Sequence, residues 1–161
     1  MKDPSLVSLL EEVFERQRNS FIRYVFETSQ AEVRDDMDRR VMAFYEDWHR
    51  QSVFHSREVE EVLSREEVAV RGSSYPIEFS QFNYLSPSYL LKHVTERMGE
   101  HLDELAEIAA RLAGWPLARD LVQSIVASER KYLDQAKKLE EGRPKEAPKP
   151  SKIKGTSASR W

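Results

Sequence analysis

Four predicted helical segments each carry one polar or charged residue among apolar residues expected to face inward: Gln17, His55, His101 and Glu129. A buried polar group without a partner costs on the order of several kcal/mol, so these residues must bond to one another, to water or to a bound ion. Two imidazoles and one carboxylate are ligands that suit Zn²⁺ or Fe²⁺. The first hypothesis is therefore a mononuclear metal site made by His55, His101 and Glu129.

The spacing of these residues favours contact across two hairpins. Gln17 and His55 are equidistant from a predicted helix break at Asp36, and His101 and Glu129 are equidistant from a predicted turn at Trp115. Gln17, Ser52 and Tyr132 would then lie beside the ligands and orient them. The metal-free alternative pairs His101 with Glu129, and Gln17 with His55, by hydrogen bonds.

The elements that must position these residues are four helices. The chain has neither Gly nor Pro from Ser5 to Arg71, which favours helix, and the apolar periodicity falters at residues 32–36. We therefore expect helices over 5–31 and 36–69. The Ser86-Pro87 pair predicts a third helix to residue 113, and the turn at Trp115-Pro116 precedes a fourth over 117–141.

These elements predict an all-α, antiparallel four-helix bundle over residues 1–141. Segment 71–86 contains Gly, Pro and spaced aromatic residues, so it is expected to be a long, partly packed connection between the second and third helices. Residues 142–161 are rich in Pro, Lys and Ser, which predicts a flexible basic tail.

Composition excludes several classes of protein. The net charge of −3 gives no drive towards nucleic acid or an anionic membrane, and the absence of cysteine excludes disulfides, thiolate metal sites and a Cys nucleophile. The chain has no apolar run long enough to span a membrane and no hydrophobic leader, so the expected location is cytoplasmic. No Gly-rich phosphate loop or Ser-His-Asp signature is present.

Over residues 5–140 the layout resembles the ferritin-like superfamily. In that family the first and third helices each give a Glu, and the second and fourth each give a Glu-x-x-His. The inward positions here hold Gln17, Ser52-x-x-His55, His101 and Glu129-x-x-Tyr132. The resemblance implies an altered or degenerate metal centre that binds Fe or Zn, with the reaction undetermined, and a homo-oligomer.

Two alternatives stay open. Glu46-x-x-His49, with Glu96 and Glu129 spaced 33 residues apart, matches the pattern of a di-iron ferroxidase or oxidase, although helical periodicity places Glu46 and Glu96 on outward faces. The other alternative is a metal-free structural or protein-interaction bundle. Aromatic residues off the inward stripe, such as Phe26 and Phe54, would then cover a dimer interface or pack under the 71–86 connection.

Overall fold

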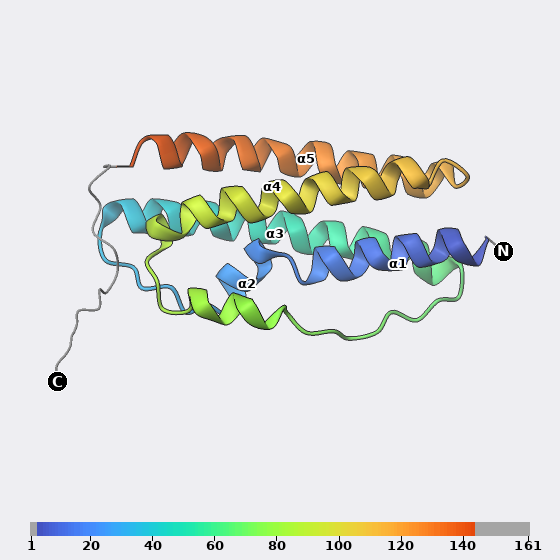
Figure 1. Cartoon of the computed structure of the whole chain (residues 1–161), viewed down its shortest axis with the longest axis horizontal. Coiled ribbons are helices and arrows are strands. Elements are labelled where there is room, and N and C mark those ends of the chain that lie inside the picture. The colour runs from blue at the N-terminus through green and yellow to red at the C-terminus, as the bar shows by residue number, and fades with distance from the viewer. Residues whose placement is uncertain (1–2, 144–161) are drawn as a thin grey trace.

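The computed structural model describes residues 3–143, and all regular structure in this range is helical (Figure 1). The prediction of an all-α protein is confirmed. The elements are five α-helices and one 3₁₀ helix: α1 (Pro4–Arg18), α2 (Phe21–Glu27), α3 (Asp36–Arg65), η1 (Ile77–Phe82), α4 (Pro87–Arg111) and α5 (Pro116–Glu141). The predicted tail from residue 144 onwards lies outside the described residues.

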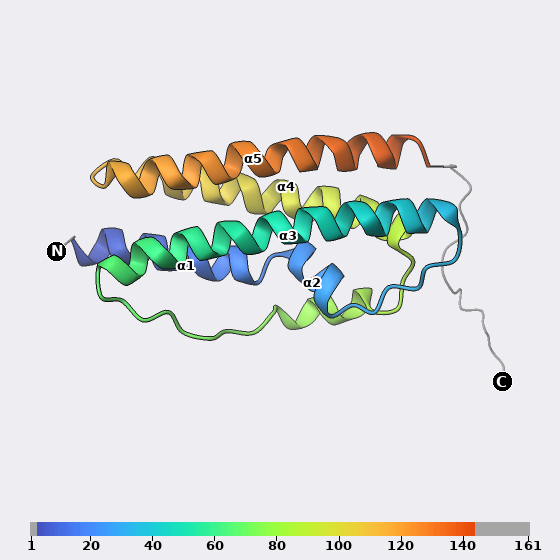
Figure 2. The same cartoon turned by 180° about the vertical axis from the view of Figure 1, so that it is seen from behind.

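The four long helices α1, α3, α4 and α5 lie side by side along the long axis of the molecule (Figures 1 and 2). Helices α1 and α5 run in one direction, and α3 and α4 run in the other. Because α3 ends at the opposite end of the molecule from the start of α4, the connection 66–86 has to return along the outside. Within residues 3–143, no helix is both long and apolar enough to cross a membrane.

The single helix predicted over residues 5–31 is wrong, because the chain breaks at Asn19 and Ser20. The Asn19 side-chain amide donates to the carbonyl oxygen of Glu15 at 3.1 Å and to Ser73 Oγ at 2.5 Å, which closes the end of α1. Helix α2 leaves the bundle axis and packs against η1. The Phe21 ring meets the rings of Phe79 and Phe82 edge-on, each at 5.1 Å between centroids.

The second long helix was predicted to reach residue 69, but α3 ends at Arg65. Glu67 adopts a left-handed conformation with φ of 59°. The Val68 amide then bonds to the carbonyl of Leu63 at 3.1 Å, and the Glu67 amide to that of Ser64 at 3.0 Å. This is a Schellman stop with glutamate where glycine is usual, so the residue type alone does not predict it. Helices α4 and α5 match their predicted bounds within two residues.

The predicted inward stripes form the core. Most apolar residues of these stripes are fully buried, and Leu6, Met37 and Phe44 are half-buried against them. One further polar contact joins the starts of α3 and α4: the buried carboxylate of Asp38 accepts the Ser88 amide at 3.0 Å and the Ser88 hydroxyl at 2.6 Å. The two helices therefore begin at a fixed register, which sets the levels of the polar residues further along them.

Candidate functional site

The polar residues predicted to face inward do meet inside the bundle. Relative exposure is 0% for Gln17, Ser52 and Glu129, 4% for His55 and 9% for His101. They come from α1, α3, α4 and α5, so every long helix contributes to one group. Below, these five residues together with Trp48 are called the buried network.

The carboxylate of Glu129 is the centre of the buried network. Its Oε1 accepts a hydrogen bond from Trp48 Nε1 at 2.8 Å. Its Oε2 accepts from His55 Nδ1 at 2.7 Å and from the side-chain amide of Gln17. Three donors from two helices, α1 and α3, therefore satisfy a carboxylate that is fully buried, which is how a buried anion is stabilised.

The amide of Gln17 joins Glu129 to His101. Gln17 Nε2 donates to Ser52 Oγ at 3.2 Å and to Glu129. The amide oxygen therefore faces His101 Nε2, at 3.0 Å. An oxygen can only accept, so His101 carries its proton on Nε2 and keeps a lone pair on Nδ1. The orientation of one amide thus fixes the tautomer of His101.

His55 lies on the other side of Glu129. Its Nδ1 donates to the carboxylate, and its Nε2 lies 3.1 Å from Gln51 Nε2, a donor at the edge of the core. A neutral imidazole with one donating and one accepting nitrogen satisfies both contacts. All side-chain partners of His55 are therefore supplied by the protein.

The structure brings His55, His101 and Glu129 into one network, but as hydrogen-bond partners. The Gln17 amide lies between His101 and Glu129, and within residues 3–143 no group of three or more His, Asp or Glu side chains is arranged to hold a metal ion. The hydrogen-bond pairs also differ from the predicted pairs, because the two histidines exchange partners. Glu129 bonds to His55 and Gln17 bonds to His101, so each bond joins the two hairpins and places them at one level.

The remaining predicted site residues differ in their outcome. Ser52 contacts Gln17 as expected. Tyr132 makes no hydrogen bond to the network: its hydroxyl donates to Asp47 at 3.2 Å, and its ring stacks on Trp48 with centroids 5.7 Å apart. It therefore covers the network on one side rather than orienting a ligand.

The di-iron alternative does not assemble in this structure. Glu46 and Glu96 are exposed, as helical periodicity predicts. His49 Nε2 lies 2.6 Å from Glu27, and the His49 ring packs against Phe26. None of these three residues contacts Glu129, which bonds only to Trp48, Gln17 and His55 among the described residues.

Sequence reasoning missed Trp48 as a member of the network. Its side chain is fully buried in the core. A buried indole N–H needs an acceptor, and Trp48 lies one turn before Ser52 and two turns before His55 on the same face of α3. This spacing, together with the need of the indole N–H for an acceptor, could have indicated that Trp48 belongs to the network.

Burial lowers the pKa of His101 to about 4, an effect that Glu129 partly opposes and Arg16 strengthens. In the unfolded chain the pKa of His101 is near 6.5, so between about pH 6.5 and 4 this histidine is protonated in the unfolded state and neutral in the folded state. The contribution of His101 to the free energy of unfolding is therefore complete above about pH 6.5 and decreases as the pH drops towards 4. We expect His101 to account for a loss on the order of 3 kcal/mol across that window.

Denaturant unfolding of wild type and His101→Gln at pH 7, 5.5 and 4 measures this contribution. The variant is expected to lose less stability than wild type on acidification. Equal losses in the two proteins would show that His101 does not cause the pH dependence.

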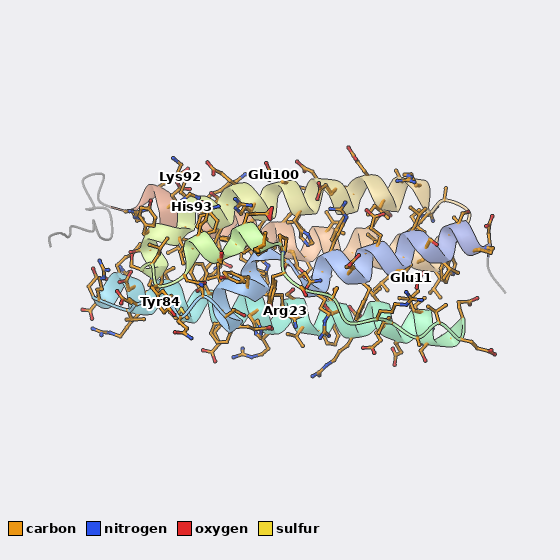
Figure 3. The ribbon with its side chains drawn as sticks, turned by 60° about the horizontal axis from the view of Figure 1, so that its bottom comes forward. Glu11, Arg23, Tyr84, Lys92, His93 and Glu100 are labelled. Carbon is orange, nitrogen blue, oxygen red and sulfur yellow. The ribbon has the colours of Figure 1, made fainter. Side chains whose placement is uncertain are left out.

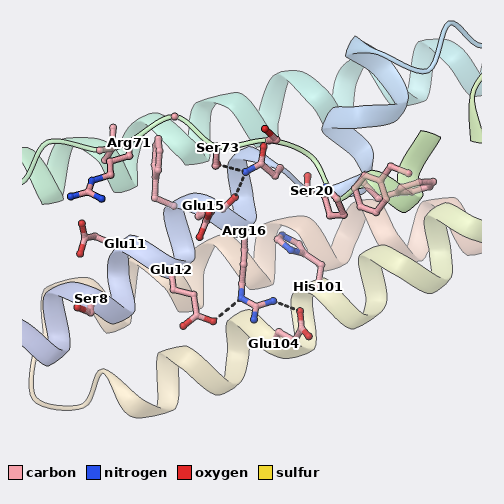
Figure 4. Close-up of a pocket in the computed structure, with 18 of the residues that line it drawn as sticks. Ser8, Glu11, Glu12, Glu15, Arg16, Ser20, Arg71, Ser73, His101 and Glu104 are labelled. Carbon is pink, nitrogen blue, oxygen red and sulfur yellow. Dashed lines mark hydrogen bonds and ion pairs between the residues drawn. The ribbon is translucent and has the colours of Figure 1, made fainter. Parts of the chain in front are cut away.

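An open groove with a volume of about 1260 Å³ lies outside the network, between α1, residues 68–76 and α4 (Figure 4). His101 is part of its lining, so the groove reaches one edge of the network. Five carboxylates line it: Glu11, Glu12, Glu15, Glu100 and Glu104. Figure 3 labels Glu11 on α1 and Glu100 on α4, the two helices that flank the connection.

Comparison with protein-family models, with curated proteins and with solved structures gives no match for this chain. The function is therefore inferred from the geometry of the network and the groove.

Proposed function

We propose that this chain is a metal-free ligand-binding bundle of ferritin-like type, in which a hydrogen-bonded core replaces the metal centre. The observation that carries this proposal is the set of atoms around Glu129. Trp48 Nε1, Gln17 Nε2 and His55 Nδ1 all present N–H groups to the carboxylate. A metal ion needs lone pairs, and neither an indole N–H nor an amide NH₂ supplies one.

Binding an ion among His55, His101 and Glu129 would have a cost. The Gln17 amide would have to leave its bonds to Ser52, Glu129 and His101. Each buried group left unpaired costs about 1–3 kcal/mol. The directions of the long helices support the ferritin-like part of the proposal, because α3 and α4 run the same way and are joined by the long connection 66–86.

The groove supports a binding role over a catalytic one. His101 is the imidazole that lines it, and its pKa of about 4 keeps it neutral at pH 7. A general base works best with a pKa near the operating pH, so His101 is suited to accept a hydrogen bond rather than to move a proton.

The second candidate is the mononuclear site, with one Zn²⁺ or Fe²⁺ on His55, His101 and Glu129. The observation in its favour is that the Gln17 amide alone separates the His101 ring from the carboxylate that His55 touches. If that side chain moved aside, two imidazoles and one anion would be left around one space, a donor set that suits either metal.

Chelation separates the two candidates. In the metal-free proposal, EDTA changes the melting temperature of the untagged protein by less than about 1 °C, since there is no bound ion to remove. Added Zn²⁺ at a small excess has an equally small effect. A fall of several degrees with EDTA, reversed by Zn²⁺ or Fe²⁺, would favour the mononuclear site.

A further inference from the structure

The groove has more carboxylates than it needs for its own cations. Arg16 bonds to Glu12 at 2.8 Å and to Glu104 at 2.5 Å (Figure 4). Arg97 lies over the rings of Phe21, Phe79 and Phe82, with its guanidinium carbon 5.0 to 5.5 Å from each centroid. The side chains of Glu11, Glu15 and Glu100 have no ion pair within the part of the chain that the structure describes. Figure 4 places the remaining lining cation, Arg71, beside Glu11.

A second observation points to a ligand in the groove. Ser20 lines it and is 4% exposed, yet Ser20 Oγ has no hydrogen-bond partner among residues 3–143. A buried hydroxyl without a partner costs free energy, so a polar group of a ligand that reached Ser20 Oγ would be stabilising. His101 adds the Nδ1 lone pair that the network leaves unused. The unpartnered groups that line the groove are therefore carboxylates, a hydroxyl and an imidazole lone pair, all of which accept hydrogen bonds.

The carboxylates are spread out rather than clustered. No group of three or more His, Asp or Glu side chains in residues 3–143 converges on one point, so a single small metal ion would not satisfy them. Glu11 and Glu15 are one helical turn apart, as are Glu100 and Glu104, which separates the Cβ atoms of each pair by about 5–6 Å. The groove follows α1 from Ser8 to Asn19, a length of about 16 Å.

We propose that the groove binds a linear polyamine, an inference that rests on the ligand-binding role proposed above. Ammonium groups separated by three or four methylenes are about 5–6 Å apart, close to the spacing of glutamate Cβ atoms one helical turn apart. One ammonium meets Glu100 and the His101 lone pair, and the next meets Glu15. A terminal ammonium donates to Ser20 Oγ, and the methylenes pack along Val70 and Phe14, which also line the groove.

Isothermal titration of spermidine into the full chain at low salt tests this proposal. We expect saturable binding with one spermidine per chain, and weaker binding of butylamine, which has one charge. The double variant Glu15→Gln/Glu100→Gln is expected to bind spermidine about tenfold more weakly. The control Glu60→Gln/Glu107→Gln removes the same charge from exposed positions outside the groove and is expected to bind as wild type does.

Several outcomes would overturn the polyamine proposal. They are equal weakening in the two double variants, displacement of spermidine by equimolar Mg²⁺, and binding of a lysine-rich peptide without binding of spermidine. The metal content of the same sample separates this failure from failure of the proposed function. If spermidine does not bind and the sample contains no metal, only the polyamine proposal is rejected. If the wild-type sample contains a metal ion that is absent from Glu129→Gln, the proposal of a metal-free bundle is rejected.

Discussion

Glu129→Ala is expected to lower the free energy of unfolding by about 3–5 kcal/mol, a large fraction of the stability of a domain of this size. The substitution removes the acceptor shared by Trp48, Gln17 and His55. All three donors are buried, so they would lose their partner without gaining water. Urea unfolding followed by circular dichroism at pH 7 gives the measurement.

Asp134→Ala is the matched control, because Asp134 is an exposed carboxylate on the same helix and outside the network. It is expected to change stability by less than about 0.5 kcal/mol. If Glu129→Ala cost no more than Asp134→Ala, the hydrogen bonds around Glu129 would not hold the core together.

Gln17→Glu is the second substitution with a large expected effect. It places a second carboxylate against Glu129 in a space without water and removes the amide hydrogens given to Ser52 and Glu129. We expect a loss of about 3 kcal/mol at pH 7. Since two adjacent carboxylates share a proton, the pKa of the pair rises on folding, and the difference in stability between the variant and wild type should narrow as the pH falls from 7.

The same variant tests what the network lacks for binding a metal. With two carboxylates and two imidazoles around one space, a divalent ion would relieve the repulsion. We expect Zn²⁺ to raise the melting temperature of Gln17→Glu by several degrees, and that of wild type or of the exposed control Gln135→Glu by less than about 1 °C. An equal response of wild type would show that the native network already accepts the ion.

Much of the buried network could be predicted from periodicity, because an inward stripe is a local property of each helix. The symmetry of His101 and Glu129 about Trp115 placed these residues at one level of α4 and α5. The crossed pairing could not be predicted. It depends on which helices touch sideways and on which way the Gln17 amide points, and residue spacing encodes neither.

The groove was not predicted from the sequence. Its outer wall is the chain at residues 68–76, which lies beside α1 because α3 ends early at the left-handed Glu67 and because Asn19 bonds to Ser73. The break at Asn19-Ser20 also contributes Ser20 to the lining. Both are departures from the regular helices that the apolar pattern indicated, and each rests on the conformation of one or two residues.

The metal content of untagged wild-type protein, measured by elemental analysis beside Glu129→Gln, tests the metal-free core most directly. We expect far less than one equivalent of Fe or Zn per chain in both samples, also after incubation with Fe²⁺ and Zn²⁺ and removal of the excess. About one equivalent in wild type that is absent from Glu129→Gln would contradict it, and would assign His55, His101 and Glu129 to a metal.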